Sequence, residues 1–172
     1  MIVNLFSVPI LIGNINLDRV KITHEKFTTG WVSATKTSHG QNNIIDPESH
    51  KYLAKTFGTL LKTLLRENLR LKITAIWENV YEKDDFQEPH VHALSHFSFI
   101  IYKEVTESQT VFFHPGKNAI QCLETINYFE THQKLPLCKG QFVIFPSFLE
   151  HMVLKSSNQK TISGNIRVEA IK

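Results

Sequence analysis

The sequence is poor in cysteine, in net charge and in long apolar runs, and each shortage excludes a class of protein. Its 172 residues include two cysteines, Cys122 and Cys138, which are too few for a disulfide framework or a zinc knuckle. The formal net charge of +3 is small and does not indicate a nucleic-acid surface. No run reaches the roughly 18 apolar residues that a membrane helix needs. We therefore expect neither a membrane nor a nucleic acid as partner.

The first twelve residues are apolar, but they lack the other features of a signal peptide. They contain no basic segment and no small-residue cleavage site, and Pro9 interrupts them. The stretch from Leu5 to Ile10 predicts an edge strand instead, because proline cannot donate a hydrogen bond to a central ladder. We expect a cytoplasmic protein.

The composition is that of a soluble globular chain, and its length suits a single domain over residues 1–172. Hydrophobic residues make up 42% and charged residues 20%, which excludes a disordered chain. Residues 1–45 predict short strands and a loop. Asp46, Pro47 and Glu48 then predict a helix start, and the apolar side chains that follow are spaced three and four apart. We expect one support helix over residues 46–68.

After this helix the hydrophobic period changes to two, which is typical of strands. The predicted strands of this β core, residues 71–168, cover 71–81, 98–102, 110–113 and 140–145, with a last one over 160–171. Between residues 117 and 134 we expect a short helix or an irregular loop. One helix followed by many strands predicts a mainly β sandwich or barrel with the long helix packed outside, α+β overall.

Three histidines form a candidate metal site. His90 and His92 lie two apart beside Pro89, which favours an extended backbone, so their side chains point to one face. His151 follows an apolar strand and could close a three-point site on that face. Neutral imidazole is a common ligand of iron, zinc and copper. An isolated His-x-His pair is more often a plain surface pair, so the distant His151 segment is what favours the metal site.

Several motifs together resemble the iron(II)- and 2-oxoglutarate-dependent dioxygenase superfamily. They are Trp77-x-Asn79, Asp85-Phe86-Gln87-x-Pro89-His90-x-His92, Ser98-x-x-x-Tyr102, Phe112-x-x-Pro115 and the run from Gly140 to His151. The branch that looks nearest is that of small prolyl-hydroxylase-like oxygenases of phages and bacteria. The resemblance covers roughly residues 71–168, and the run from Gly140 to His151 is its most specific part.

The resemblance implies a double-stranded β-helix, or jelly roll, with iron held by His90, His92 and His151. The superfamily usually places a carboxylate where this chain has His92, so the expected site is one unit more positive than usual. Zinc or nickel would also suit three imidazoles. The resemblance implies no catalytic residue beyond the metal centre.

The resemblance also implies a binding site for 2-oxoglutarate. The expected co-substrate residues are Tyr102, Lys160, Asn79, Tyr81 and Ser163. Tyr102 would supply a hydroxyl, and Lys160, nine residues after His151, would supply the cation for the distal carboxylate. Lys160 and Ser163 fall on opposite faces of a regular strand, whereas Gln159, Thr161 and Arg167 share the face of Ser163. Gln159, Thr161 and Arg167 therefore stay open as alternatives to Lys160.

The implied activity is decarboxylation of 2-oxoglutarate coupled to hydroxylation of a substrate, with iron(II) as cofactor and ascorbate as a candidate reductant. The substrate is a protein side chain or a small molecule, and a peptidyl prolyl side chain is the first expectation. One alternative is a cupin-like metal protein, although the glutamate usual in cupins is replaced by His96 and Phe97. The other is a non-catalytic jelly roll with a structural or binding role.

Overall fold

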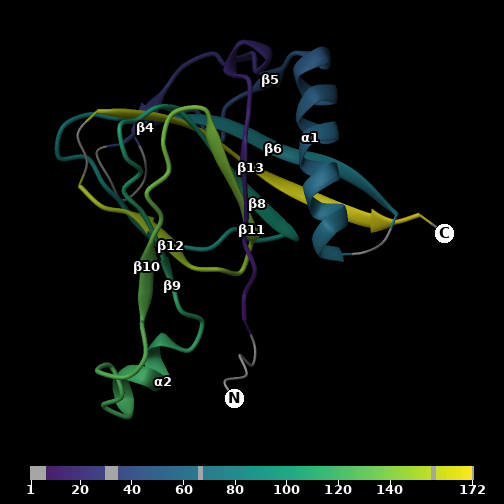
Figure 1. Cartoon of the computed structure of the whole chain (residues 1–172). Helices are drawn as coiled ribbons and strands as arrows, with labels where there is room; N and C mark the ends of the chain where they lie inside the picture. Colours follow the sequence, from purple (N-terminus) through teal and green to yellow (C-terminus); the bar gives the residue numbers. More distant parts are fainter. Residues whose placement is uncertain (1–6, 30–34, 66–67, 156–157, 172) are drawn as a thin grey trace.

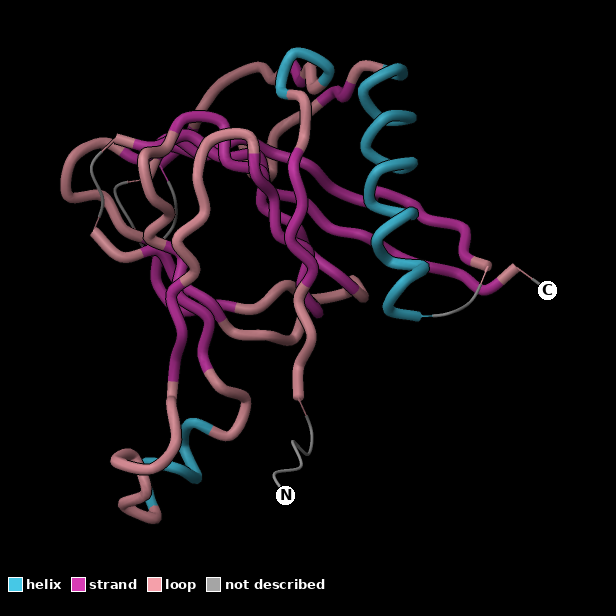
Figure 2. Tube along the Cα trace, viewed as in Figure 1, coloured by secondary structure: helices cyan, strands magenta, loops and turns pink. Residues whose placement is uncertain are grey.

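Two large antiparallel sheets, a small two-stranded one and one long helix form most of the protein (Figures 1 and 2). The structure is a computed structural model that describes residues 7–29, 35–65, 68–155 and 158–171. The larger sheet has the spatial order β1 (Leu11–Asn14), β11 (Gln141–Pro146), β8 (Phe97–Glu104), β13 (Gln159–Ala170), β6 (Leu69–Tyr81), β4 (Lys36–Thr37) and β3 (Thr28–Thr29). The smaller sheet has the order β10 (His132–Lys134), β9 (Thr110–Phe113), β12 (His151–Val153) and β7 (Gln87–His90).

The remaining elements are short, apart from helix α1 (Pro47–Leu65). Strands β2 (Ile22–Thr23) and β5 (Ile44–Ile45) pair with each other, and η1 (Leu17–Arg19) is a single 3-10 turn. Helix α2 (Lys117–Cys122) lies between β9 and β10, in a hairpin that extends away from the sheets (Figure 1).

Alternation along β8 divides the core into two layers. Phe99 and Ile101 pack in the cluster that includes α1, whereas Ile100 and Tyr102 pack in a second cluster with Phe112 of the smaller sheet. Successive side chains of a strand point to opposite faces, so one central strand serves both layers. The larger sheet is therefore buried on both faces, with α1 on one and the smaller sheet on the other.

Helix α1 forms where the sequence predicts it and closes one face of the larger sheet. The backbone N–H of Ser49 donates to the Asp46 carboxylate at 3.0 Å, so Asp46 caps the helix. Leu53, Phe57 and Leu61 are fully buried at intervals of four residues. The Phe57 ring lies 4.8 Å from the Phe99 ring, measured between centroids. The helix is a support element, as expected.

The mainly β fold with one long outer helix is confirmed, and the differences from expectation are local. Residues 5 and 6 lie outside the described residues, and the backbone from Ser7 to Ile10 is not a strand. The edge strand β1 begins at Leu11, after Pro9, because proline supplies no N–H for pairing with β11. The expected loop around residues 28–43 contains the short hairpin β3–β4. In the described part of the chain, neither helix has the length and apolar character needed to cross a membrane.

Candidate metal centre

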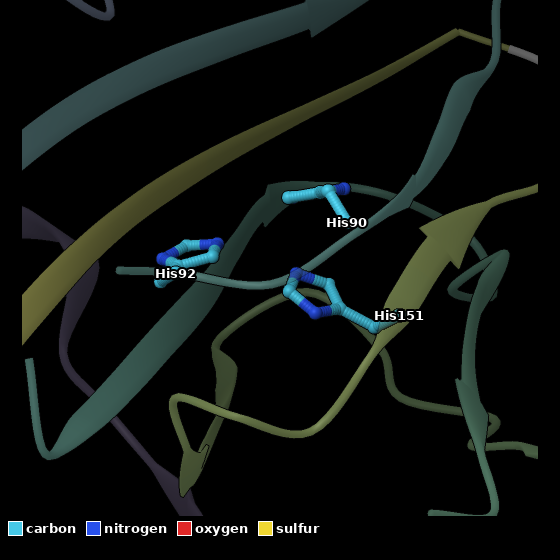
Figure 3. A group of neighbouring side chains, drawn as sticks. All are labelled: His90, His92 and His151. Carbon is cyan, nitrogen blue, oxygen red and sulfur yellow. The ribbon is translucent and has the colours of Figure 1, made fainter. Parts of the chain in front are cut away.

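Three histidines from two neighbouring strands gather at one point (Figure 3). His90 ends β7, His92 follows two residues later, and His151 begins β12. The antiparallel register pairs His90 directly with His151. One ring nitrogen from each histidine lies within 4.8 Å of the corresponding nitrogens of the other two. The structure thus brings together the three side chains that the sequence singled out.

An oxygen atom lies beside the Nδ1 atom of each of these rings. His90 Nδ1 is 2.8 Å from the backbone oxygen of Glu88, and His151 Nδ1 is 3.1 Å from that of Leu149. His92 Nδ1 is 2.6 Å from Oδ1 of Asn165. Because an oxygen acceptor requires a proton on Nδ1, the lone pair of each neutral ring is on Nε2. This is how metal-ligating histidines are usually oriented.

Burial keeps the three imidazoles neutral. Loss of solvation lowers the pKa of His90 and lowers the pKa of His92 to about 4. His151 is only 2% exposed, and burial lowers its pKa well below the ordinary value. Imidazole must be neutral to bind a metal, so the site needs no proton release near neutral pH. Three neutral nitrogen donors fit a divalent ion such as iron, zinc or nickel.

The histidines lie at the junction of two cavities. The outer one is a cleft of about 390 Å³ whose walls include Thr35, Thr37, His39, Trp77 and residues 87–93. The inner one is a narrow cavity of about 20 Å³. Trp77, Asn79, Gln87, His90 and His92 line both. The outer cleft therefore provides the room for a bound molecule, and the inner cavity presents polar groups at its end.

The inner cavity carries three of the expected co-substrate residues on its walls. Asn79, Tyr81 and Ser163 line it, together with Thr161 and Thr110. Asn79 Nδ2 donates to Ser163 Oγ at 3.1 Å, and the Tyr81 hydroxyl donates to Gln87 Oε1 at 2.8 Å. Burial raises the pKa of Tyr81, so its phenol stays protonated and remains a donor. The walls of this cavity therefore carry neutral hydrogen-bonding groups.

Tyr102 lies behind the wall of this cavity, next to Thr110. It is fully buried, and its hydroxyl donates to Oγ1 of Thr110, which does line the cavity, at 3.0 Å. Burial also raises the pKa of Tyr102. Tyr102 therefore contacts a residue of the cavity wall but does not itself line the cavity.

Lys160 does not face either cavity, contrary to expectation. Its ammonium group pairs with Glu104 at 3.0 Å, and its side chain is 46% exposed. Alternation along β13 directs Thr161 and Ser163 inwards, so Lys160 between Gln159 and Thr161 points outwards. In the described part of the chain, no lysine or arginine lines either cavity.

Of the three alternatives to Lys160, Thr161 lines the inner cavity, whereas Gln159 and Arg167 line neither cavity and differ in their placement. Gln159 is buried, at 2% exposure, on the same face of β13 as Thr161. Arg167 is exposed, and its Nε donates to the backbone oxygen of Leu94 at 3.0 Å. Of the two, only Gln159 is an interior residue.

Sequence reasoning missed some of the residues that shape the site. Thr37 Oγ1 donates to Asn79 Oδ1 at 2.7 Å, and the His39 ring lies 4.6 Å from the Trp77 ring. Both residues come from a segment that was expected to be a loop, and nothing in its sequence pattern pointed to Asn79 or Trp77. Asn165 lies 73 positions from His92 in the sequence, so no local signal connected the two.

Several solved structures resemble this chain in fold although their sequences are only 11–12% identical to it. HygX from Streptomyces hygroscopicus, solved with nickel, 2-oxoglutarate and hygromycin B bound, has a TM-score of 0.55 at 11% identity over 93% of this chain and 83% of its own. An oxidoreductase of the 2OG-Fe(II) oxygenase family from Burkholderia pseudomallei has a TM-score of 0.54 at 12% identity, over 77% of this chain and 68% of its own. A prolyl-4-hydroxylase from Pseudomonas putida has a TM-score of 0.51 at 12% identity, over 82% and 77%. These likenesses show the jelly-roll fold.

The family follows from the sequence itself. No curated protein matches the chain. A family model described as "Putative 2OG-Fe(II) oxygenase" matches residues 75–163, a span of 89 residues (163 − 75 + 1) among the 172 of the chain. This span holds Asn79, Tyr81 and all three histidines. The protein therefore belongs to this family of iron(II)- and 2-oxoglutarate-dependent oxygenases.

Proposed function

We propose that His90, His92 and His151 hold iron(II) through their Nε2 atoms and that the enzyme hydroxylates a side chain of an extended peptide. The observation that carries the metal assignment is the fixed tautomer of all three rings, each with an oxygen at Nδ1. When bound, iron(II) and 2-oxoglutarate use dioxygen to place an oxygen atom on a C–H bond, with release of succinate and carbon dioxide. The protein itself binds the cofactors and the substrate, orients them and excludes water from the site.

The polar end of the inner cavity supports a role in binding the co-substrate. Asn79 and Ser163 are 3% and 7% exposed, so a carboxylate that reaches them leaves bulk water. Hydrogen bonds are stronger in such surroundings than in water. We infer that neutral hydroxyl groups, with Ser163 and Thr161 among them, take the place that Lys160 was expected to fill.

The peptide assignment rests on the edge of the smaller sheet. Strand β7 ends the spatial order of that sheet and, among the described residues, pairs only with β12. Residues 87–90 of β7 also line the outer cleft beside His90. An exposed strand edge offers backbone groups to an extended peptide, which would then pass directly over the metal ligands.

An anaerobic titration tests the cofactor assignment. Iron(II) and 2-oxoglutarate added together should produce the weak visible charge-transfer band of the bound pair, and substitution of His90 or His151 by alanine should abolish it. Metal binding without this band would favour a cupin-like protein. Failure to bind any metal would favour a structural role for the jelly roll.

The substrate is tested separately with a library of unstructured peptides. The loaded enzyme should add one oxygen atom to a subset of them, with matching consumption of 2-oxoglutarate, as read by mass spectrometry. Turnover with small molecules alone, such as the hygromycin B bound in the HygX structure, would replace the peptide assignment and leave the cofactor assignment intact.

A further inference from the structure

We propose that Asn165, Ser98 and Ser147 form a positioning relay that fixes the tautomer of His92 and so allows a histidine to stand where the superfamily usually places a carboxylate. The inference rests on the proposed role of His92 as a metal ligand. A carboxylate can bind a metal through either oxygen, whereas an imidazole binds only when the correct nitrogen carries the lone pair. His92 therefore needs a partner that a carboxylate in its place would not need.

The relay is a continuous chain of side-chain hydrogen bonds. Ser98 Oγ lies 3.2 Å from Asn165 Oδ1 and 2.8 Å from Ser147 Oγ. Ser95 Oγ, in turn, donates to Ser147 Oγ at 2.9 Å. Ser98 and Ser147 are 0% and 1% exposed, so water does not compete for these contacts.

The direction of these bonds determines which His92 nitrogen is protonated. The Ser95 hydroxyl donates a hydrogen bond to Ser147 Oγ, and the Ser98 hydroxyl donates one to Asn165 Oδ1. The Ser147 hydroxyl is then free to donate to Ser98 Oγ. The Asn165 oxygen receives that bond and lies 2.6 Å from His92 Nδ1. An oxygen there accepts a proton from Nδ1, and the lone pair of His92 remains on Nε2.

Ser147 also ties together the two segments that carry the histidines. The backbone N–H of His92 donates to the Ser147 oxygen at 3.0 Å, and the N–H of Ser147 donates to the His96 oxygen at 3.1 Å. Ser147 precedes His151 by four residues, in the connection between β11 and β12. The relay thus holds the His92 loop against the segment that leads to His151.

Nitrogen NMR of the histidine rings in the metal-free protein tests the tautomer directly. In the wild type, His92 should carry its proton on Nδ1. Asn165→Ala removes the acceptor and should move the proton towards Nε2, the form that neutral imidazole prefers in water. Asn165→Asp keeps an oxygen at the same place and should restore the wild-type signal. A merely structural role for Asn165 would not produce this reversal.

Cobalt(II) affinity, measured by visible absorbance, supplies the second readout. Asn165→Ala should weaken cobalt(II) binding by about 10- to 100-fold, the usual effect of losing such a partner of a ligand. Asn165→Asp should bind cobalt(II) at least as tightly as the wild type. Thr74→Val is the matched control, because Thr74 Oγ1 contacts the backbone oxygen of Asn165 at 3.3 Å and not its side chain. This control should leave both readouts unchanged.

The outcomes separate the relay from the proposed function. If Asn165→Ala keeps both the Nδ1 proton and wild-type cobalt affinity, the relay is wrong. If Asn165→Ala does not fold, Ser98→Ala removes one hydroxyl only, and unchanged readouts in that variant would likewise overturn the relay. If His92→Ala leaves cobalt affinity intact while His90→Ala abolishes it, the proposed ligand set itself fails.

Discussion

Single side chains set the chemistry of this centre through burial and one hydrogen bond each. His90, His92 and His151 are neutral because solvation of their charged forms is lost, and each is oriented by an oxygen at Nδ1. Fixing three rings in this way costs stability at acid pH, since folded and unfolded chains bind different numbers of protons. The same property that prepares the site for a metal therefore makes the metal-free protein sensitive to acid.

The free energy of unfolding of the metal-free protein should fall as the pH drops from about 7 to about 5. The unfolded histidines take up protons near their ordinary pKa of about 6.5, whereas the pKa of folded His92 is lowered to about 4. Between these values the unfolded state binds more protons, so stability rises with pH and is lost as the pH falls. We expect a loss on the order of 2 kcal/mol from His92 alone, with further losses of the same sign from His90 and His151, measured by urea unfolding with a chelator present.

The variant His92→Gln is the control for this pH effect. It removes one of the three groups and should reduce the slope of stability against pH over the same range. Stability that does not change between these pH values in the wild type would contradict the assignment of neutral, buried histidines.

Strand β13 decides which polar groups reach the inner cavity. Its inward positions carry Thr161, Ser163 and Asn165, and its outward position 160 carries the lysine. The pairing of β13 with β8 shifts register between Lys160 and Thr161, at the point where the strand approaches the site. One strand therefore supplies both the proposed wall for the co-substrate and the partner of His92.

Lys160→Ala should leave the affinity for 2-oxoglutarate unchanged, because the ammonium group pairs with Glu104 at the surface. Ser163→Ala should weaken it roughly 3- to 10-fold, the effect of one neutral hydrogen bond of about 1 kcal/mol. The charge-transfer band, titrated anaerobically with 2-oxoglutarate, measures both. A large loss in Lys160→Ala with none in Ser163→Ala would show that the lysine turns inwards when the co-substrate binds.

Gly164→Ala should destabilise the protein by about 3 kcal/mol. A Cβ at this position of β13 would lie 2.5 Å from the backbone oxygen of Ala75 and would also overlap the Phe99 ring. Gly58→Ala in α1 is the matched control, since nothing lies within 4 Å of a Cβ there, and it should stabilise by about 0.5–1 kcal/mol. Urea midpoints of the two variants should move in opposite directions, and equal shifts would contradict the packing at Gly164.

For the molecule as a whole, the larger sheet separates the support from the site. Phe57 and its neighbours on α1 pack on one face of this sheet, whereas Ile100, Tyr102 and the polar cavity lie on the other. The helix therefore contributes stability without contact to the metal centre.

Phe57→Ala should lower the free energy of unfolding by about 3–5 kcal/mol, because it empties a fully buried position between the Phe99 and Phe142 rings. Cobalt affinity at low temperature, where the variant is folded, should stay at the wild-type value. Lys55→Ala, on the exposed face of α1, should change neither quantity. A loss of metal affinity in folded Phe57→Ala would mean that the two layers are coupled.

Local signals in the sequence were sufficient to predict most of the helices and strands. Asp46 and Pro47 predicted the start of α1, and the change of period after it predicted β6, β8, β9, β11 and β13. The His-x-His spacing and the run from Gly140 to His151 identified the three histidines and the family. These features are local because capping and alternation depend on residues only a few positions apart.

The groups that surround the histidines could be identified only from the folded arrangement of the strands. The spacing of nine residues from His151 to Lys160 could not fix a face, because a shift of one residue turns a side chain to the other side of a sheet. Asn165 meets His92 across 73 positions, and Thr37 meets Asn79 across 42. Such contacts depend on strand order and register, which the pairing of distant segments sets and no local pattern encodes.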